Sequence, residues 1–509
     1  MIFLTALILR FWQLPQRVIF TEDHAWLATI AYKNIIYHEP LLMGSSIGGV
    51  WATFPPTYAY LTTFLLKITN FDYYILHNLT ATANVLAIVL MIVCLPRLLG
   101  RKAAILTVFL YSLSFFVVSG AIVGLNPGAI PPLTVILVIT TILYFRDKKL
   151  WALPIAVATI SLMTHLHVTP FFLIPGLILL PILYLRDLRL KNLIVIALSG
   201  LIFLYLGVRP HYLENKAFGG QNVVKVVNAI KEGGSGNAIN KFQSLLNFGV
   251  SLTRINGDLL FPDPRGWQDQ SPTSPPVAAL GMLLTLGAIA WSLRNLLISL
   301  KKPSANAIVA ILFLSYLIFQ ALIPSYGSAS GKPFRWLDSV YFPLFFLTLS
   351  DLLLFVFSLI KIPKIKVLLG IIAISAFIIT NLVKWSTDAQ IENRMKLMTI
   401  KKLVALTIPN ITKDDKYNFI HIGSVNSNPT WPFSFVLWKE TGQSKFLRLL
   451  LWNVGPNKNE PFYIFVSHNE PAGQLENSEK VARSFQDRPQ VLNLGEVEDY
   501  FVEKIYDRK

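Results

Sequence analysis

The sequence predicts an all-α polytopic membrane protein with about eleven transmembrane helices and a small C-terminal α/β domain outside the membrane. Hydrophobic residues make up 53% of the 509 residues and charged residues only 14%, with a mean hydropathy of +0.53. A soluble globular chain carries about 25% charged residues, so this composition excludes an ordinary soluble domain. Long apolar runs recur up to about residue 384, and a more polar composition follows. We therefore predict a transmembrane region at about 1–384 and an extracytoplasmic domain at about 385–509.

Eleven apolar runs approach the roughly 20 residues that a helix needs to cross a bilayer. They lie at about 1–20, 73–96, 103–123, 129–145, 150–168, 170–185, 192–208, 276–293, 305–324, 338–360 and 367–384. We expect the first run to be a retained span, because no small-residue cleavage site of a signal peptide follows it. Its short start leaves room for residues before Met1. The shorter stretch from Pro55 to Ile68 begins with two prolines and predicts an interfacial or re-entrant helix.

Basic residues mark one side of the predicted bundle. They cluster at 97–102, 146–149, 186–191, 294–302 and 361–366, and two predicted spans separate each cluster from the next. The positive-inside rule makes this side cytoplasmic. The N-terminus is then cytoplasmic, and the loops at about 21–72 and 209–275 lie outside the plasma membrane. The net charge of +17 belongs to the cytoplasmic loops on this interpretation, so no nucleic-acid partner is predicted.

The region after residue 384 predicts a small mixed α/β domain. Its apolar runs at 417–422 and 461–466 are short and are bounded by turn residues, which is typical of strands. Cys94 is the only cysteine of the chain, so neither an intrachain disulfide nor a cysteine metal cluster is possible. No cofactor is expected.

Two acids and a histidine, Glu22, Asp23 and His24, follow the first apolar run directly, on the predicted outer side. Residues 25–36 have the apolar spacing of a helix. One interpretation is structural: Asp23 caps or leads this helix, which stabilises it by about 1 kcal/mol. The other interpretation is chemical, because a carboxylate at this position is available as a general base.

Features further along the chain favour the chemical interpretation. The same loop continues with Pro40-Leu-Leu-Met-Gly44-Ser-Ser-Ile-Gly48-Gly49 and the proline-containing aromatic stretch 53–60. Leu125-Asn126-Pro127 ends the third predicted span, and Thr164-His165-Leu166-His167 precedes Pro170. In their order and common side, these features resemble membrane glycosyltransferases of the GT-C fold. The branch they resemble most contains protein O-mannosyltransferases and aminoarabinose transferases. The resemblance covers roughly residues 1–360 and does not extend to the C-terminal domain.

The resemblance implies an enzyme that passes a sugar from a polyprenyl-phosphate carrier to a lipid, glycan or protein acceptor on the outer face. Such enzymes carry an essential acid in the first outer loop, usually in an Asp-Glu pair. Asp23 occupies the position of that acid here, while His24 stands where the Glu is usual, and Glu22 precedes the pair. Relatives often carry a second acid near the outer end of the third span, where this chain has Asn126.

The chemistry of glycosyl transfer fits a single carboxylate. The attacking hydroxyl must lose its proton to a base as the new bond forms, so Asp23 is the predicted general base, with Glu22 and His24 beside it. In an inverting displacement the base and the leaving phosphate lie on opposite faces of the sugar. The phosphate departs as an anion, so it needs cations or hydrogen-bond donors rather than a general acid.

Candidate residues for the donor lie in other outer segments. Lys332 and Arg335 precede a predicted span and suit a phosphate, although snorkelling to lipid headgroups is an equal alternative. Asp338 lies near the start of an apolar run, where it pairs with Arg335 one turn away or holds substrate.

Asn126, His165 and His167 complete the predicted substrate site, with a structural role for either histidine left open. No metal is expected, because the two histidines do not share a helix face and no further ligand lies nearby.

Two other functions remain open from the sequence. A lipid-linked saccharide flippase or transporter would need repeated halves and polar residues near the bilayer midplane, and no such repeat is evident. A scaffold for other envelope proteins would reduce the three polar residues at 22–24 to a helix cap. It predicts that Asp23→Asn leaves activity intact.

Overall fold

The computed structural model describes residues 1–42, 44, 46–47, 52–184, 190–231, 241–262, 274–300, 302–322, 339–390, 397–410, 418–422, 430–441, 462–467, 489–497 and 500–507. Contacts within the chain divide it into two units. Unit 1 comprises Met1–Trp12, Leu42–Tyr58 and His77–Asp388, and unit 2 comprises Gln13–Leu41, Ala59–Leu76 and Ala389–Lys509. The predicted boundary near residue 385 and the extracytoplasmic position of the C-terminal region stay predictions.

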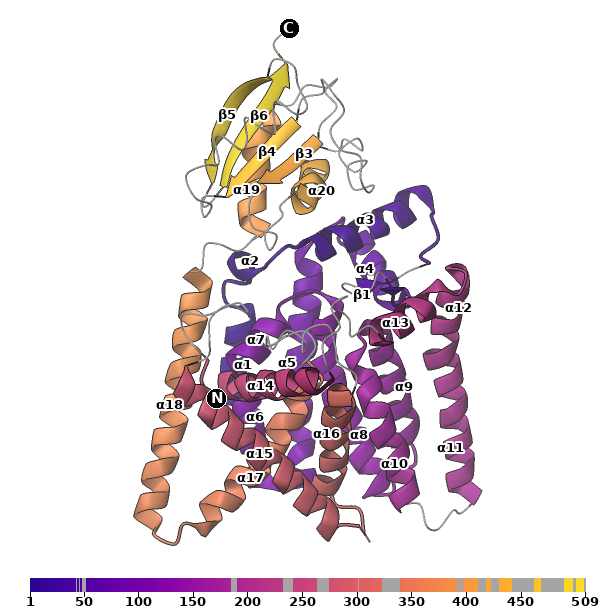
Figure 1. Ribbon diagram of the computed structural model, residues 1–509, viewed down its shortest axis with the longest axis vertical. Helices are drawn as coiled ribbons and strands as arrows, with labels where there is room; N and C mark the ends of the chain where they lie inside the picture. Colours follow the sequence, from indigo (N-terminus) through magenta and orange to yellow (C-terminus); the bar gives the residue numbers. More distant parts are fainter. Residues whose placement is uncertain are drawn as a thin grey trace. The chain divides into compact units, whose positions relative to one another are not determined.

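The regular structure of the described part of unit 1 is helical apart from one short hairpin (Figure 1). Its helices are α1 (Ile2–Phe11), α5 (Tyr74–Leu99, beginning in unit 2), α6 (Arg101–Leu113), α7 (Phe115–Ala121), η1 (Asn126–Ala129), α8 (Ile130–Phe145), α9 (Ala152–Leu166), η2 (Thr169–Leu173), α10 (Ile174–Tyr184), α11 (Leu190–Ile202), η3 (Phe203–Val208), α12 (Arg209–Ala217), α13 (Gln221–Lys231), α14 (Lys241–Leu260), α15 (Pro275–Ile298), α16 (Ala305–Leu322), α17 (Tyr341–Leu359) and α18 (Pro363–Gln390). The hairpin pairs β1 (Ser46–Ile47) with β2 (Ala52–Thr53) in antiparallel fashion. Helices suit so apolar a chain because they satisfy every backbone polar group internally, as the hydrocarbon of a membrane requires.

Among the described residues, seven helices are long and apolar enough to cross a membrane, and α6 with α7 makes an eighth if the bent pair is one span. The protein is therefore a multi-pass membrane protein. The other three predicted spans are helical too, but they form shorter apolar helices at Ile2–Phe11, Ala152–Leu166 and Thr169–Tyr184. A helix of 15 residues rises only about 22 Å, which is less than the roughly 30 Å of bilayer hydrocarbon. The count of eleven spans stays a prediction.

The bend between α6 and α7 measures 63° and has identifiable partners. It occurs at Ser114, whose hydroxyl donates to the carbonyl oxygen of Leu259 at 2.9 Å. The backbone N–H of Phe115 donates to Asn381 Oδ1 at 2.7 Å. The Asn381 side chain of α18 thus satisfies a backbone N–H that the broken helix exposes, as buried backbone requires.

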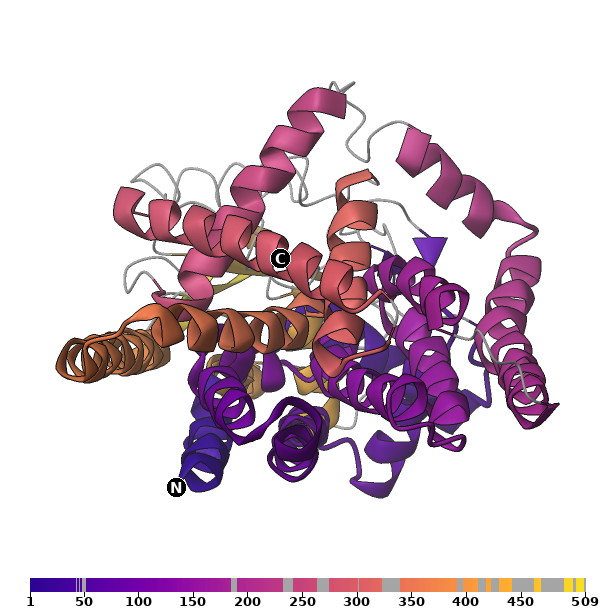
Figure 2. The same ribbon diagram turned by 90° about the horizontal axis from the view of Figure 1, so that it is seen from below.

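Burial separates a central layer of helices from peripheral ones. Most residues of α8 and α16 are buried, whereas α11 and α18 expose nearly their whole apolar length. Figure 2 shows α18 and α11 at opposite margins of the bundle. Such exposure would be unfavourable in water, so these two helices present the surface that lipid covers.

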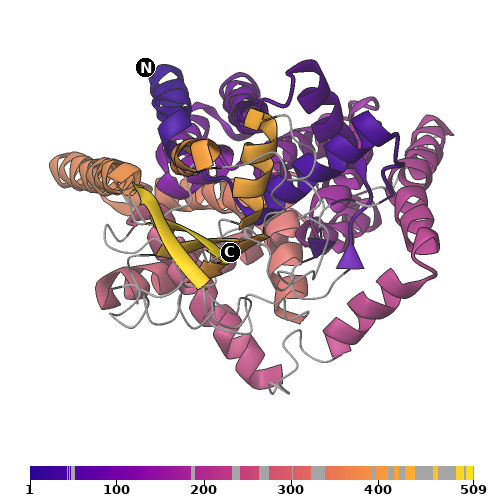
Figure 3. The same cartoon turned by 90° about the horizontal axis from the view of Figure 1, so that it is seen from above.

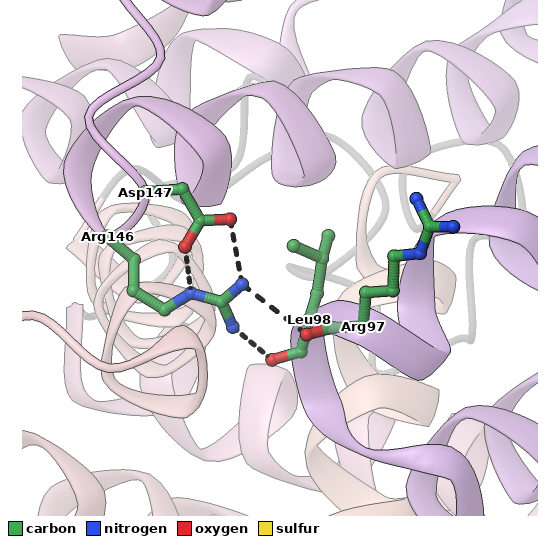
Figure 4. A network of polar contacts seen from close by, with 4 residues as sticks. All are labelled: Arg97, Leu98, Arg146 and Asp147. Atoms are coloured by element: carbon green, nitrogen blue, oxygen red, sulfur yellow. Dashed lines mark hydrogen bonds and ion pairs between the residues drawn. The ribbon is translucent and has the colours of Figure 1, made fainter.

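Arg146 joins two of the predicted basic loops at one end of unit 1. Its guanidinium donates to both oxygens of Asp147, at 2.6 and 2.9 Å, and to the carbonyl oxygens of Arg97 and Leu98 (Figure 4). Those carbonyls belong to the last turn of α5, where helix acceptors have no partner within the helix. The clusters at 97–102 and 146–149 therefore lie at the same end of unit 1, as their common side requires.

Unit 2 combines helices from both ends of the sequence with a sheet. It contains α2 (Leu14–Arg17), α3 (Glu22–Tyr37), most of α4 (Thr57–Ile68), α19 (Leu397–Thr407), η5 (Ile408–Asn410), α20 (Thr430–Thr441), β3 (Asn418–Ile422), β4 (Phe462–Ser467), β5 (Pro489–Val497) and β6 (Tyr500–Asp507).

The strand order is β3-β4-β6-β5 (Figure 1), with β3 and β4 parallel and the other pairs antiparallel. Figure 3 shows the strands of this sheet, in yellow and brown, from above. The two β-like runs at 417–422 and 461–466 are therefore strands, and the helices predicted at 25–36 and 55–68 are α3 and α4.

Candidate active site

Helix α3 begins with a cap that does not use Asp23. Thr21 is the N-cap residue, and Glu22, Asp23 and His24 occupy the first three helical positions. The backbone N–H of Thr21 lies 3.1 Å from His24 Nδ1, and the Thr21 hydroxyl oxygen lies 2.9 Å from the same atom. Because a backbone N–H can only donate, Nδ1 must be an unprotonated acceptor. Thr21 and His24 form the capping box of this helix, so the capping role considered for Asp23 is filled by its neighbours.

The Asp23 carboxylate has no such structural task. Its side chain is exposed, and within the described part of the chain it makes no hydrogen bond or ion pair. The surrounding protein nevertheless disfavours its charged form, so desolvation raises the pKa of Asp23 above its usual value of 3.8. A raised pKa makes the carboxylate a stronger base, and exposure leaves it accessible to a substrate hydroxyl. The side chain of Glu22 lies outside the described residues.

Helix α20 from the C-terminal region packs against α3 within unit 2. The ring of Trp438 contacts Tyr32 of α3 edge-on, with centroids 4.4 Å apart, and contacts Phe71 at 5.3 Å. Lys439 Nζ donates to the carbonyl oxygen of Phe71 at 2.8 Å and lies 4.7 Å from the ring centroid of Tyr73. This partial burial lowers the pKa of Lys439.

The start of α3 joins the same aromatic cluster. The Phe20 ring stacks on His24 at 5.5 Å and packs against Tyr73 and Phe435 at 4.9 and 6.1 Å. Aromatic pairs at such distances contribute about 0.5–1.5 kcal/mol each beyond their buried area. The C-terminal region therefore helps to fix the helix that carries Asp23.

Unit 1 brings together three of the predicted substrate-binding residues near the C-terminal end of α9. His165 is buried, and its Nδ1 atom lies 2.8 Å from the hydroxyl oxygen of Thr57. The Asn126 side-chain amide donates to the carbonyl oxygen of Leu166, the last residue of α9. Asn126 thus satisfies an orphan carbonyl at a helix end, which a carboxylate at this position would not do.

His167 follows immediately. Its Nδ1 atom lies 3.0 Å from the hydroxyl oxygen of Thr169, and its ring stacks on Phe54 at 6.3 Å.

His211, in α12, belongs to the same cluster. Its ring centroid lies 5.2 Å from that of His165, and the two Nε2 atoms are buried. Backbone carbonyls of Leu206 and Gly207 lie beside His165. Within the described residues, however, no group completes a hydrogen bond with either Nε2 atom. Two buried imidazole nitrogens are thus left available to a polar partner.

The sequence analysis missed a buried acid, Glu214. Its carboxylate accepts hydrogen bonds from Thr53, in the strand β2, and from Asn222, in α13, while Asn222 also donates to Thr53 at 3.2 Å. This contact ties the predicted first outer loop to α12 and α13. The sequence carried no clear signal for it, because Glu214 lies in the polar stretch 209–217 beyond the predicted span at 192–208.

The remaining predicted residues cannot be placed. Lys332, Arg335 and Asp338 lie outside the described residues, which stop at 322 and resume at 339. Among the described residues, no group of three or more His, Cys, Asp or Glu could hold a metal ion.

The sequence itself matches none of the protein-family models and none of the curated proteins with which it was compared. Its structure, in contrast, is similar to solved membrane proteins. One is ArnT, the aminoarabinose transferase of Cupriavidus metallidurans, bound to undecaprenyl phosphate, with a TM-score of 0.59 and 11% identity. The comparison with the apo form of the same enzyme gives a TM-score of 0.57 at 12% sequence identity. Both comparisons cover 99% of this chain and 97% of the other.

An archaeal enzyme shares the architecture less completely. The oligosaccharyltransferase of Archaeoglobus fulgidus, in complex with Zn and sulfate, gives a TM-score of 0.52 at 13% identity. That comparison covers 94% of this chain and 68% of the other. Both neighbours are GT-C glycosyltransferases. The fold of this chain is therefore the GT-C fold of membrane glycosyltransferases.

Proposed function

We propose that the protein is an inverting glycosyltransferase that moves a sugar from a polyprenyl-phosphate carrier to an acceptor hydroxyl on the outer face of the membrane. Asp23 acts as the general base. The observation that carries the proposal is the Asp23 carboxylate itself, which is exposed at the start of α3 while Thr21 and His24 make the cap. The fold shared with an enzyme bound to undecaprenyl phosphate supports the class of donor.

A single base is sufficient for the proposed transfer step. The acceptor hydroxyl gives its proton to an Asp23 oxygen while its own oxygen forms a bond to the anomeric carbon of the sugar. The bond from that carbon to the phosphate oxygen breaks, and its electron pair leaves with the lipid phosphate. Attack occurs opposite the leaving group, so the configuration inverts. General-base catalysis of this kind contributes about 10²–10⁴-fold to the rate.

The donor phosphate requires hydrogen-bond donors or cations on its own side of the sugar. We propose Lys332 and Arg335 for this role, with Asp338 holding Arg335 or the sugar. In the described part of unit 1, His165, His167 and His211 are candidate donors. The two buried Nε2 atoms support this assignment. One N–H of the Asn126 amide donates to Leu166, so its proposed contact with substrate uses the second N–H or Oδ1.

The test uses purified protein in lipid with radiolabelled undecaprenyl-phosphate hexoses and pentoses, and compares wild type with Asp23→Asn. We expect wild type to release or transfer the sugar and the variant to lose at least about a hundredfold of that rate. Glu39→Gln is the matched control, because Glu39 is an exposed acid just beyond the other end of α3, in a loose 3.9 Å pair with Lys33.

Two outcomes would contradict the proposal. Equal turnover in wild type and Asp23→Asn would remove Asp23 as the base. Movement of labelled donor across the bilayer without any sugar transfer would support the flippase alternative instead.

A further inference from the structure

We propose that His24 is a positioning residue, whose Nδ1 atom fixes the first turn of α3 and thereby the orientation of the Asp23 carboxylate. This inference rests on the proposed function of Asp23. It also assigns a physical role to the position at which the resembled enzymes usually carry a Glu.

The geometry at His24 Nδ1 carries the inference. The usual capping box pairs Ser or Thr at the N-cap with Glu or Gln three residues later, whose side chain accepts from the N-cap backbone N–H. Here Thr21 is the N-cap, and His24 is the third helical residue. The 3.1 Å contact from the Thr21 N–H to Nδ1 is the bond that the Glu or Gln oxygen makes elsewhere. Histidine thus replaces a carboxylate as the acceptor.

The surroundings explain why an imidazole suits this position. The side chain of His24 is 1% exposed and stacks on Phe20, which itself packs on Tyr73 and Phe435. A carboxylate buried against these rings would pay a large desolvation penalty, whereas a neutral imidazole offers an acceptor without a charge. The flat ring also continues the aromatic cluster that holds α20 against this part of unit 2.

The effect on Asp23 follows from its place in the chain. Glu22 and Asp23 are the two residues between the N-cap and His24. The first backbone N–H groups of a helix have no partner within it, so an uncapped first turn frays. When Nδ1 holds Thr21, the backbone of Asp23 is fixed on both sides, which restricts the positions that its exposed carboxylate can reach. A base that must meet a hydroxyl within hydrogen-bond reach depends on that restriction.

Two variants of similar size separate capping from packing. His24→Gln keeps a side-chain acceptor at the third helical position, whereas His24→Leu keeps the volume and loses the acceptor. His38→Asn is the matched control at the other end of α3, because the exposed His38 occupies a left-handed conformation that Asn tolerates. His24→Met replaces His24→Leu if the latter does not fold.

The first readout is amide hydrogen exchange over residues 19–27, which needs no substrate. Loss of a helix cap speeds exchange in the first turn by about fivefold, from the typical worth of a cap. We expect this acceleration in His24→Leu and wild-type protection in His24→Gln and His38→Asn.

The second readout is steady-state transfer. We expect kcat to fall at least about threefold in His24→Leu, with KM for the lipid donor unchanged, and to stay within about twofold in His24→Gln. If His24 served packing alone, His24→Leu would keep more activity than His24→Gln, because Leu packs better in an aromatic cluster than Gln. Equal exchange in the two variants, or better turnover in His24→Leu, would overturn the inference.

The experiment also keeps the two proposals apart. Faster exchange in His24→Leu together with full activity of Asp23→Asn would leave the cap in place and remove the assigned base. Loss of activity in Asp23→Asn with identical behaviour of the two His24 variants would keep the base and remove the positioning role.

Discussion

At the scale of single residues, the stretch 21–24 has a structural role and a proposed chemical role, and the hydrogen bonds show which residues have the structural one. Thr21 and His24 satisfy the start of α3, and Asp23 between them keeps an exposed carboxylate with a raised pKa. Asn126 shows the reverse case. Its amide is used inside the protein, because it donates to the carbonyl of Leu166.

The pH dependence of transfer should report Asp23. A general base works only when deprotonated, so activity falls as the pH drops through its pKa. Because that pKa is raised, the acid limb of kcat/KM should lie above 3.8, the usual value. A pH–rate profile of wild type measures the limb, and Asp23→Glu serves as the comparison. A profile that stays flat down to pH 4 would contradict the assignment.

Asn126→Asp should destabilise the outer end of α9. A carboxylate cannot donate to the Leu166 carbonyl and repels it, and a buried acceptor without its donor costs about 1–3 kcal/mol. We expect a lower melting temperature in detergent and reduced turnover, with Asn126→Gln as the variant that keeps the donor. An unchanged melting temperature in Asn126→Asp would show that this contact contributes little.

At the scale of elements, the C-terminal helix α20 and the N-terminal helix α3 form one structural feature. Trp438 contacts Tyr32 and Phe71, and Lys439 binds the Phe71 carbonyl. These contacts join segments about 400 positions apart in the sequence. The orientation of α3 therefore depends on a region that carries no catalytic motif of its own.

Trp438→Ala tests whether the packing of α20 on α3 supports sugar transfer. Removing a well-packed indole costs about 3–5 kcal/mol when the side chain is buried, and Trp438 is 9% exposed. We expect limited proteolysis to release the C-terminal region faster and transfer to fall. Trp438→Phe, which keeps an aromatic ring, should recover much of the resistance to proteolysis and much of the transfer activity. Full activity of Trp438→Ala would mean that α20 does not support α3.

At the scale of the whole molecule, two polar contacts join segments of unit 1 that lie far apart in the sequence. Arg146 ties the 146–149 cluster to the last turn of α5. Residues from the predicted outer loops meet in the contact of Thr53 with Glu214. The apolar surfaces of α11 and α18 face lipid. The orientation of unit 1 relative to the cell stays a prediction.

Single-cysteine labelling tests that orientation. In a background with Cys94→Ala, a cysteine at Lys148 should react with a membrane-impermeant maleimide only after the cell is opened. A cysteine at Glu39, in the first outer loop, should react in intact cells. These positions are chosen because the positive-inside rule places them on opposite sides. The reverse pattern would invert the topology and exclude catalysis on the outer face.

The sequence alone determined the class of the molecule and most of its elements. Apolar runs become helices because lipid leaves the backbone no other partner, and the strands β3 and β4 follow their local pattern. It also located Asp23, because an acid in a chain this apolar stands out. Only the tertiary structure decided which residue caps α3, that Asn126 supports α9, that α20 holds α3, and that Glu214 is buried against Thr53. The last three facts depend on contacts between distant segments, and hydrophobic periodicity carries no information about which side chains meet. The cap joins residues only three apart, but its acceptor is a histidine in place of the usual Glu or Gln.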